Sequence, residues 1–194
     1  LAARSGLKSA YALGNRTALL FGKYPFRGHD GLTGACFSSL NYNRQLGVGF
    51  VLSANSNQPT DKFEGLIATY LAEHWPPPPG YQSLAILPLD TAAIRPYLGM
   101  YQLESPRNAI SGFRDRLADA PRISLRDGHL YFKPLLGEAS ELVQTGPLTF
   151  AWSGMNTPLV AFTRNNSGLP VLLIGGAYYE QTDAHWAILK RVLI

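Results

Sequence analysis

The sequence has 194 residues, 46% of them hydrophobic and 15% charged, so it can hold one full domain or part of a domain with a small second one. Its formal charge of +4 comes from basic residues that are scattered along the chain, which argues against a nucleic-acid partner. The single cysteine, Cys36, excludes an internal disulfide, and no stretch approaches the roughly 18 to 20 apolar residues of a membrane span.

The first half of the chain predicts an antiparallel sheet. It begins at Leu1 without an initiator methionine or a signal peptide, and we expect it to be a piece of a longer protein. Apolar segments at 11–15 and 17–22 are plausible strands. A glycine-punctuated strand follows at 27–39, in which the run 35–40 is strand-like. The turn residues at 41–45 predict that residues 46–54 pair back as a central strand covered on both faces.

A helix is predicted over residues 60–75, because its apolar residues recur at i, i+3 and i+4. Glu64 and Glu73 fall on the polar side of this helix and are expected to be solvated. The helix must end at Trp75, since the prolines that follow cannot donate backbone hydrogen bonds. We interpret residues 76–88 as a linker that is stiff at its start.

The second half predicts a series of short strands, with one helical turn at 90–95 before them. Arg126-Asp127-Gly128 is a strong hairpin signal. The expected strands are 97–103, 122–125, 129–133, 141–144, 148–152, 159–164, 171–179 and 186–193. Short strands at this spacing indicate a small antiparallel barrel or sandwich, whose aromatic residues either form the core or line a pocket.

The fold class is therefore α+β. Residues 1–75 supply part of an antiparallel sheet with its C-terminal helix, residues 76–88 are a Pro-rich linker, and residues 89–194 form a small all-β antiparallel barrel.

Residues 28–55 resemble the third motif of serine β-lactamase-like hydrolases, the family of class C β-lactamases, penicillin-binding DD-peptidases and related esterases. The resemblance rests on Gly28-His29-Asp30-Gly31, on Thr33-Gly34, and on Gln45-Leu46-Gly47 leading to Val51-Leu52-Ser53-Ala54-Asn55. The tail that opens with Tyr97-Leu98-Gly99-Met100-Tyr101 resembles the lipocalin-like barrel that follows some of these enzymes.

The resemblance implies a role for four residues. His29 matches the Lys or His that holds substrate and assists proton transfer to and from the nucleophile. Gly31 matches the glycine that lets the substrate backbone lie along the strand, with Thr33 as a second substrate-binding residue. The N–H of Leu32 matches the strand donor of the oxyanion hole, a contact usually worth a few kcal/mol in the transition state.

The family nucleophile lies in Ser-x-x-Lys, followed by Tyr-x-Asn. Our interpretation assigns both motifs to polypeptide outside this sequence and predicts that this chain alone is inactive. The intact protein is then a serine hydrolase that acts by acyl transfer on an amide, β-lactam or ester, and the remainder of the hydrolase domain is this chain's main partner. By resemblance, we expect a periplasmic or secreted protein, a small-molecule or peptide substrate, and no cofactor.

An alternative from a different class is a non-catalytic binding or regulatory module, whose barrel holds a small apolar ligand or mediates oligomers. His74, His129 and His185 lie far apart in the sequence and show no metal-ligand spacing, so no metal site is predicted. Cys36 is expected to be a small buried residue rather than a nucleophile.

Overall fold

The structure is a computed structural model that describes residues 15–18, 26–56, 61–75, 79, 83–105, 120–155 and 157–183. The chain folds as two compact units. The first contains β1 (Arg16–Ala18), β2 (Phe26–Thr33), β3 (Cys36–Asn43), β4 (Val48–Ala54) and α1 (Asp61–His74). The second contains α2 (Thr91–Ile94), η1 (Arg95–Tyr97), β5 (Gly99–Leu103), β6 (Arg122–Arg126), β7 (His129–Lys133), β8 (Ser140–Gly146), β9 (Thr149–Trp152), β10 (Val160–Arg164), β11 (Pro170–Ile174) and β12 (Ala177–Thr182).

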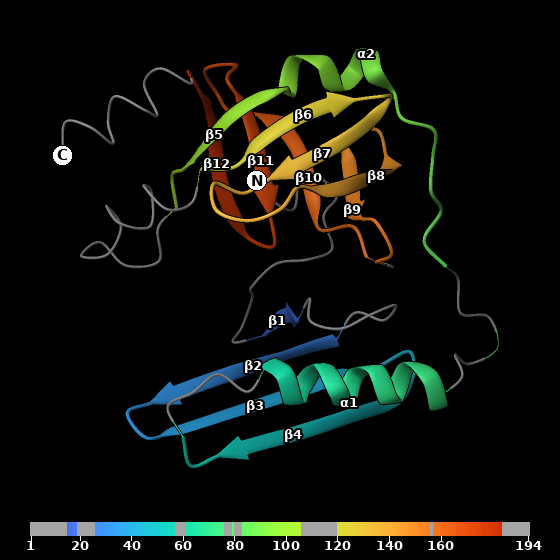
Figure 1. Ribbon diagram of the computed structural model, residues 1–194, viewed down its shortest axis with the longest axis vertical. Helices are drawn as coiled ribbons and strands as arrows, with labels where there is room; N and C mark the ends of the chain where they lie inside the picture. The colour runs from blue at the N-terminus through green and yellow to red at the C-terminus, as the bar shows by residue number, and fades with distance from the viewer. Residues whose placement is uncertain are drawn as a thin grey trace. The chain divides into compact units, whose positions relative to one another are not determined.

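The first unit is an antiparallel sheet in the order β1-β2-β3-β4, and α1 runs roughly along the direction of its strands (Figure 1). The expected pairing of residues 46–54 with the strand before them is confirmed. The single strand expected over 27–39 is wrong, because the chain reverses at Gly34 and Ala35 and forms two paired strands, β2 and β3. The expected central position is wrong, because β4 pairs with β3 alone among the described strands, and Val51 is 68% exposed. A run of apolar residues without strict alternation therefore did not indicate burial on both faces.

Helix α1 confirms the predicted helix, but its orientation differs from the prediction. Glu64 is buried, with 1% of its surface exposed, whereas Phe63 and Leu66 are 62% and 68% exposed. Glu73 is exposed, as expected. At the end of the helix, the indole Nε1 of Trp75 donates to the carbonyl of Leu46 at 3.1 Å. The apolar spacing of the helix therefore does not identify its buried side.

The second unit is a closed barrel of antiparallel strands in the order β10-β11-β12-β5-β6-β7-β8-β9 (Figure 1). The prediction of a small antiparallel barrel is confirmed. The expected strand at 186–193 lies outside the described residues. The helical turn expected at 90–95 is present as α2, and the carboxylate of Asp90 caps it by accepting from the amide of Ala93 at 3.0 Å.

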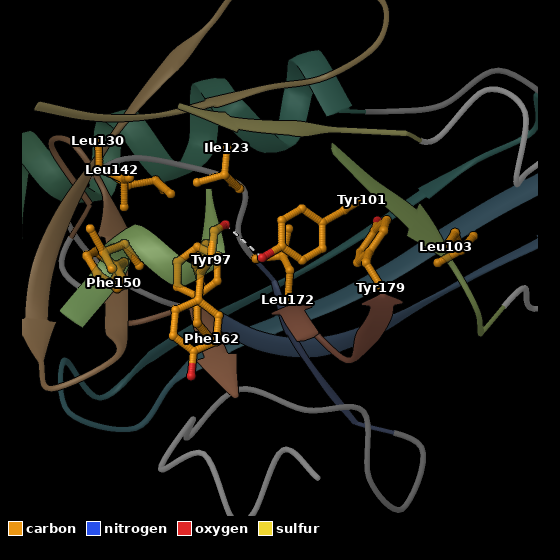
Figure 2. Packing of buried hydrophobic residues seen from close by; sticks show 12 residues of the cluster. Tyr97, Tyr101, Leu103, Ile123, Leu130, Leu142, Phe150, Phe162, Leu172 and Tyr179 are labelled. Atoms are coloured by element: carbon orange, nitrogen blue, oxygen red, sulfur yellow. Dashed lines mark hydrogen bonds between the residues drawn. The ribbon is translucent and has the colours of Figure 1, made fainter. Parts of the chain in front are cut away.

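Side chains fill the inside of the barrel (Figure 2). Ile94 of α2 and Tyr97 of η1 belong to the same buried cluster as the strand residues, so this helical segment packs into the barrel core. Tyr101 is fully buried, and its hydroxyl donates to the carbonyl of Tyr97 at 2.8 Å. The ring of Phe162 contacts the rings of Tyr97, Tyr101 and Phe150. These aromatic residues form a core, the first of the two expected roles.

Two hairpin turns explain how the strands are divided. Asp127 and Gly128 both have positive φ, 50° and 81°, as the predicted two-residue turn between β6 and β7 requires. Gly175 and Gly176 also have positive φ, 53° and 104°, and join β11 to β12. The single strand predicted over 171–179 is therefore wrong: the two glycines reverse the chain.

The segment before α2 is attached to the barrel through Gln144. The amide of Leu87 donates to the backbone carbonyl of Gln144 at 2.8 Å, and the amide of Asp90 donates to its side-chain oxygen at 2.7 Å. The side-chain nitrogen of Gln144 in turn donates to the carbonyl of Gly146 at 3.0 Å. The last residues of the predicted linker are thus held against β8.

Candidate functional site

The predicted site residues all lie on β2, at and beyond the point where its pairing with β1 ends. β1 pairs with residues 26–28 of β2, and β3 pairs with the whole of the strand. A two-residue loop joins β2 to β3, and Gly34 adopts a φ of 36° at its first position, where a hairpin turn favours glycine. Residues 29–33 therefore have β3 on one side and no described strand on the other.

The pairing places His29 and Gly31 on the same exposed sheet face. His29 is opposite Leu40, which is opposite Val51 on β4, and these three share a row because paired residues of antiparallel strands point to one face. The next row on this face contains Gly31, Ser38 and Ser53.

The hydroxyls of Ser38 and Ser53 lie within hydrogen-bonding distance, 3.1 Å, and both residues are exposed. The sequence prediction missed this serine pair, although strand alternation from His29 through the hairpin would have placed Ser38 on the face of His29. The face thus combines an imidazole, an open glycine position and two hydroxyls that can hydrogen-bond to a ligand.

The backbone N–H of Leu32 faces the side of β2 that has no neighbouring described strand. Thr33 and Cys36 flank the two-residue loop and form a hydrogen-bonded pair, so the N–H of the preceding residue, Leu32, is directed away from β3. This is the geometry required of a donor to a group outside the sheet. The side chain of Leu32 is 58% exposed.

The fold requires glycine at one of the two motif positions, 28 and 31, and not at the other. A Cβ added at Gly28 would lie 1.8 Å from the backbone carbonyl oxygen of Leu40, so the fold itself requires glycine there. A Cβ added at Gly31 would meet nothing within 4 Å, and Gly31 does not have a positive φ. The described structure therefore gives no folding reason for glycine at position 31.

The other face of the sheet is buried and carries both polar and aromatic residues. Ser39, Asn41 and Asn43 of β3 are almost fully buried, as are Phe26 and Phe37, and Glu64 of α1 is buried too. The amide of Asn41 donates to the hydroxyl of Ser39 at 3.4 Å. A buried polar side chain requires hydrogen-bonding partners, so Ser39 and Asn41 favour the strand register that buries both of them.

Cys36 lies on the exposed face in the row after Ser38, so the expectation that it is buried is wrong. Its thiol lies 3.7 Å from the side-chain oxygen of Asn55. The cause is strand alternation: Phe37, its neighbour, takes the buried side.

A Ser-x-x-Lys tetrapeptide does occur in this chain, as Ser5-Gly6-Leu7-Lys8, which corrects the interpretation that assigned this motif wholly to outside polypeptide. These residues lie outside the described part of the structure. Ser5 is therefore a serine of this chain that stands at the nucleophile position of the motif.

Two tyrosines of the barrel have raised pKa values. Burial raises the pKa of the Tyr101 hydroxyl most strongly, with a further contribution from Tyr97. Burial, together with a hydrogen bond to Glu180, raises the pKa of Tyr178 to about 12. Glu180 also accepts from the side-chain amide of Asn165 at 2.8 Å. These groups belong to the barrel unit and form no part of the candidate site.

No group of three or more His, Cys, Asp or Glu side chains suited to a metal ion occurs in the described ranges. Of the helices that the structure describes, none is long and apolar enough to cross a membrane.

Comparison with known proteins gives a weak likeness. A crystal structure of SurE with D-Leu matches 92% of this chain at 20% sequence identity with a TM-score of 0.42, and a crystal structure of SurE matches 92% at 19% identity with a TM-score of 0.40. This chain spans only 40% and 39% of those chains. No family model matches the sequence, and no curated protein matches it.

Proposed function

We propose that this chain is the C-terminal part of a serine hydrolase of the β-lactamase and penicillin-binding type, acting by acyl transfer on an amide, β-lactam or ester. Residues 1–75 belong to the catalytic domain, and residues 89–194 form a lipocalin-like barrel. The observation that carries the proposal is the open space over Gly31, next to the unpaired side of β2 and beside His29. An extended substrate can lie along that side of the strand.

In this proposal the chain supplies one wall of the active site. A serine attacks the substrate carbonyl, and the negative charge that develops on the carbonyl oxygen is stabilised in part by the N–H of Leu32. His29 holds the substrate and takes part in moving the proton of the nucleophile. Ser38 and Ser53 are positioned to hydrogen-bond to groups of the substrate that rest on the exposed face.

The test uses the full-length protein that contains this chain, treated with a fluorescent penicillin and with a fluorophosphonate. We expect covalent labelling by at least one reagent, and His29→Ala should slow the labelling by roughly 10²-fold or more. The matched control is His129→Ala, which removes an exposed histidine of the barrel and should label at the wild-type rate. Absence of labelling by both reagents, or an unchanged rate for His29→Ala, would overturn the proposal.

The oxyanion role of Leu32 has its own test. Leu32→Pro removes the N–H that points to the open side of β2, a position where a strand tolerates proline. We expect the labelling rate to fall by roughly 10²-fold to 10³-fold, whereas Leu32→Ala retains the N–H and should change it little. Equal rates for the two variants would exclude this amide as a catalytic donor.

The second candidate, a barrel that holds a small apolar ligand, receives no support from the barrel interior. The cluster of Tyr97, Tyr101, Phe150 and Phe162 occupies the space that such a ligand would need (Figure 2). The other two parts of this alternative, a regulatory role and the formation of oligomers, stay predictions.

A further inference from the structure

One face of α1 carries large apolar side chains that point to solvent. Phe63, Leu66 and Tyr70 are 62%, 68% and 59% exposed. Their spacing of three and four residues aligns them along a single side of the helix. Aligned apolar residues of this size on a helix surface mark an interaction site rather than scattered exposure.

Charged residues lie at the two ends of the same face. Lys62 precedes Leu66 by four residues and Glu73 follows Tyr70 by three, so both extend the apolar row, and both are exposed. We call these five residues, Lys62, Phe63, Leu66, Tyr70 and Glu73, the α1 stripe. It is positive near the start of the helix, apolar in the middle, and negative near the end.

This order of charges makes the α1 stripe complementary to itself in one orientation only. If two copies pack antiparallel, Lys62 of each meets Glu73 of the other, and Phe63 meets Tyr70 across the interface. If they pack parallel, Lys62 meets Lys62 and Glu73 meets Glu73, which is repulsive. A two-fold axis through the middle of the stripe, near Leu66, satisfies both copies equally.

Tyr70 is already held in place for such a contact. Its ring stacks on the imidazole of His74, with the ring centroids 4.3 Å apart and the planes inclined by 18°. Nδ1 of His74 lies 3.0 Å from the carbonyl of Tyr70, which fixes the imidazole against the helix. An aromatic side chain that is ordered before binding loses less conformational entropy in an interface.

We propose that this chain forms a homodimer in which the α1 stripes of two copies pack antiparallel. The apolar middle supplies the affinity, and the Lys62–Glu73 pairs set the orientation, because exposed ion pairs contribute little free energy. The expected affinity is modest, with a dissociation constant in the micromolar range, since the stripe is small compared with a standard interface.

Sedimentation of the full-length protein that contains this chain, over a concentration series, tests the proposal. We expect a dimer that dissociates on dilution, and Leu66→Glu should weaken it by at least about thirtyfold, because a charge enters the interface twice. The matched control is Leu136→Glu in the barrel unit, where the leucine is 81% exposed; it should dimerise as the wild type does. Circular dichroism verifies that both variants stay folded.

Charge reversal tests the orientation. Lys62→Glu and Glu73→Lys should each weaken the dimer, and the double variant should restore it. A wild-type chain that stays monomeric would overturn the proposal and leave the stripe to a different polypeptide. A dimer that Leu66→Glu does not weaken, or single charge reversals without effect, would overturn it as well.

Discussion

The barrel and the sheet unit bury their apolar side chains to different extents. In the barrel, twelve of the described residues form one buried cluster, and the ring of strands closes on itself. In the sheet unit, Leu40, Val51 and Leu66 are exposed, while Asn41 and Glu64 are buried. The barrel thus buries its apolar side chains against one another. The sheet unit exposes apolar side chains on a surface suited to contact with other polypeptide.

The largest effect expected from this contrast is in the barrel core. Phe162→Ala should lower the free energy of unfolding of the barrel by about 3–5 kcal/mol, since it leaves a cavity between three aromatic rings. Val51→Ala in the sheet should change stability by about 0.5 kcal/mol or less, because most of its side chain is already in water. Chemical denaturation measures the free energy of unfolding of both variants. Equal losses would show that buried apolar side chains of the barrel contribute no more stability than exposed ones of the sheet.

The next effect concerns the two glycines of β2. Gly28→Ala should destabilise the sheet unit by about 3 kcal/mol, because the new methyl group overlaps the carbonyl oxygen of Leu40, which is backbone and cannot rotate away. Gly31→Ala should leave the thermal unfolding midpoint unchanged, since the added group meets open space. If Gly31→Ala unfolds the sheet as Gly28→Ala does, position 31 is structural and its proposed substrate role loses its main support.

A smaller effect is expected from the buried side of α1. Glu64→Ala should cost about 1–3 kcal/mol, because it removes a buried polar side chain together with the interaction that this side chain makes. Glu73→Ala, on the exposed side of the same helix, should cost about 0.5 kcal/mol or less in a monomeric sample. Urea denaturation at low protein concentration compares them, and the reverse order would contradict the observed orientation of α1.

The smallest effect is a pH dependence in the barrel. The folded pKa of Tyr178 is raised from 10.0 to about 12, so the folded state keeps this proton more tightly than the unfolded chain does. The resulting stability is fully present below pH 10.0 and is lost as pH rises toward about 12. Tyr178→Phe should therefore lose stability less steeply over this interval. Thermal unfolding across alkaline pH measures the difference, and parallel curves would exclude the contribution.

The parts of the fold that follow from local chemistry could be predicted from the sequence. Asp127-Gly128 supports the two positive φ values of a hairpin turn, and the proline run after Trp75 terminates a helix, so these boundaries depend on few residues. Gly175-Gly176 carries the same turn signal as Asp127-Gly128, yet the apolar residues on both sides made it resemble one strand.

The faces of the sheet unit could not be predicted in the same way. Glu64 of α1 is buried, and so are Ser39 and Asn41 of β3. Which strand residues face inward depends on the register between strands rather than on the helix sequence. Cys36 is exposed for the same reason, since a shift of one residue would exchange the two faces. For the candidate site, the sequence identified His29 and Gly31, but the pairing of Ser38 with Ser53 depends on a register that no local motif encodes.

The closed ring of the barrel has a consequence for how the protein misassembles. A barrel strand can be exchanged with another molecule only if the ladders on both of its sides open, whereas residues 29–33 of β2 and the outer side of β4 have no neighbouring strand among the described residues. Unpaired strand edges are templates for aggregation. Accordingly, fibrillar or strand-swapped material formed on storage should contain protected amides from the sheet unit, with the barrel unit still native.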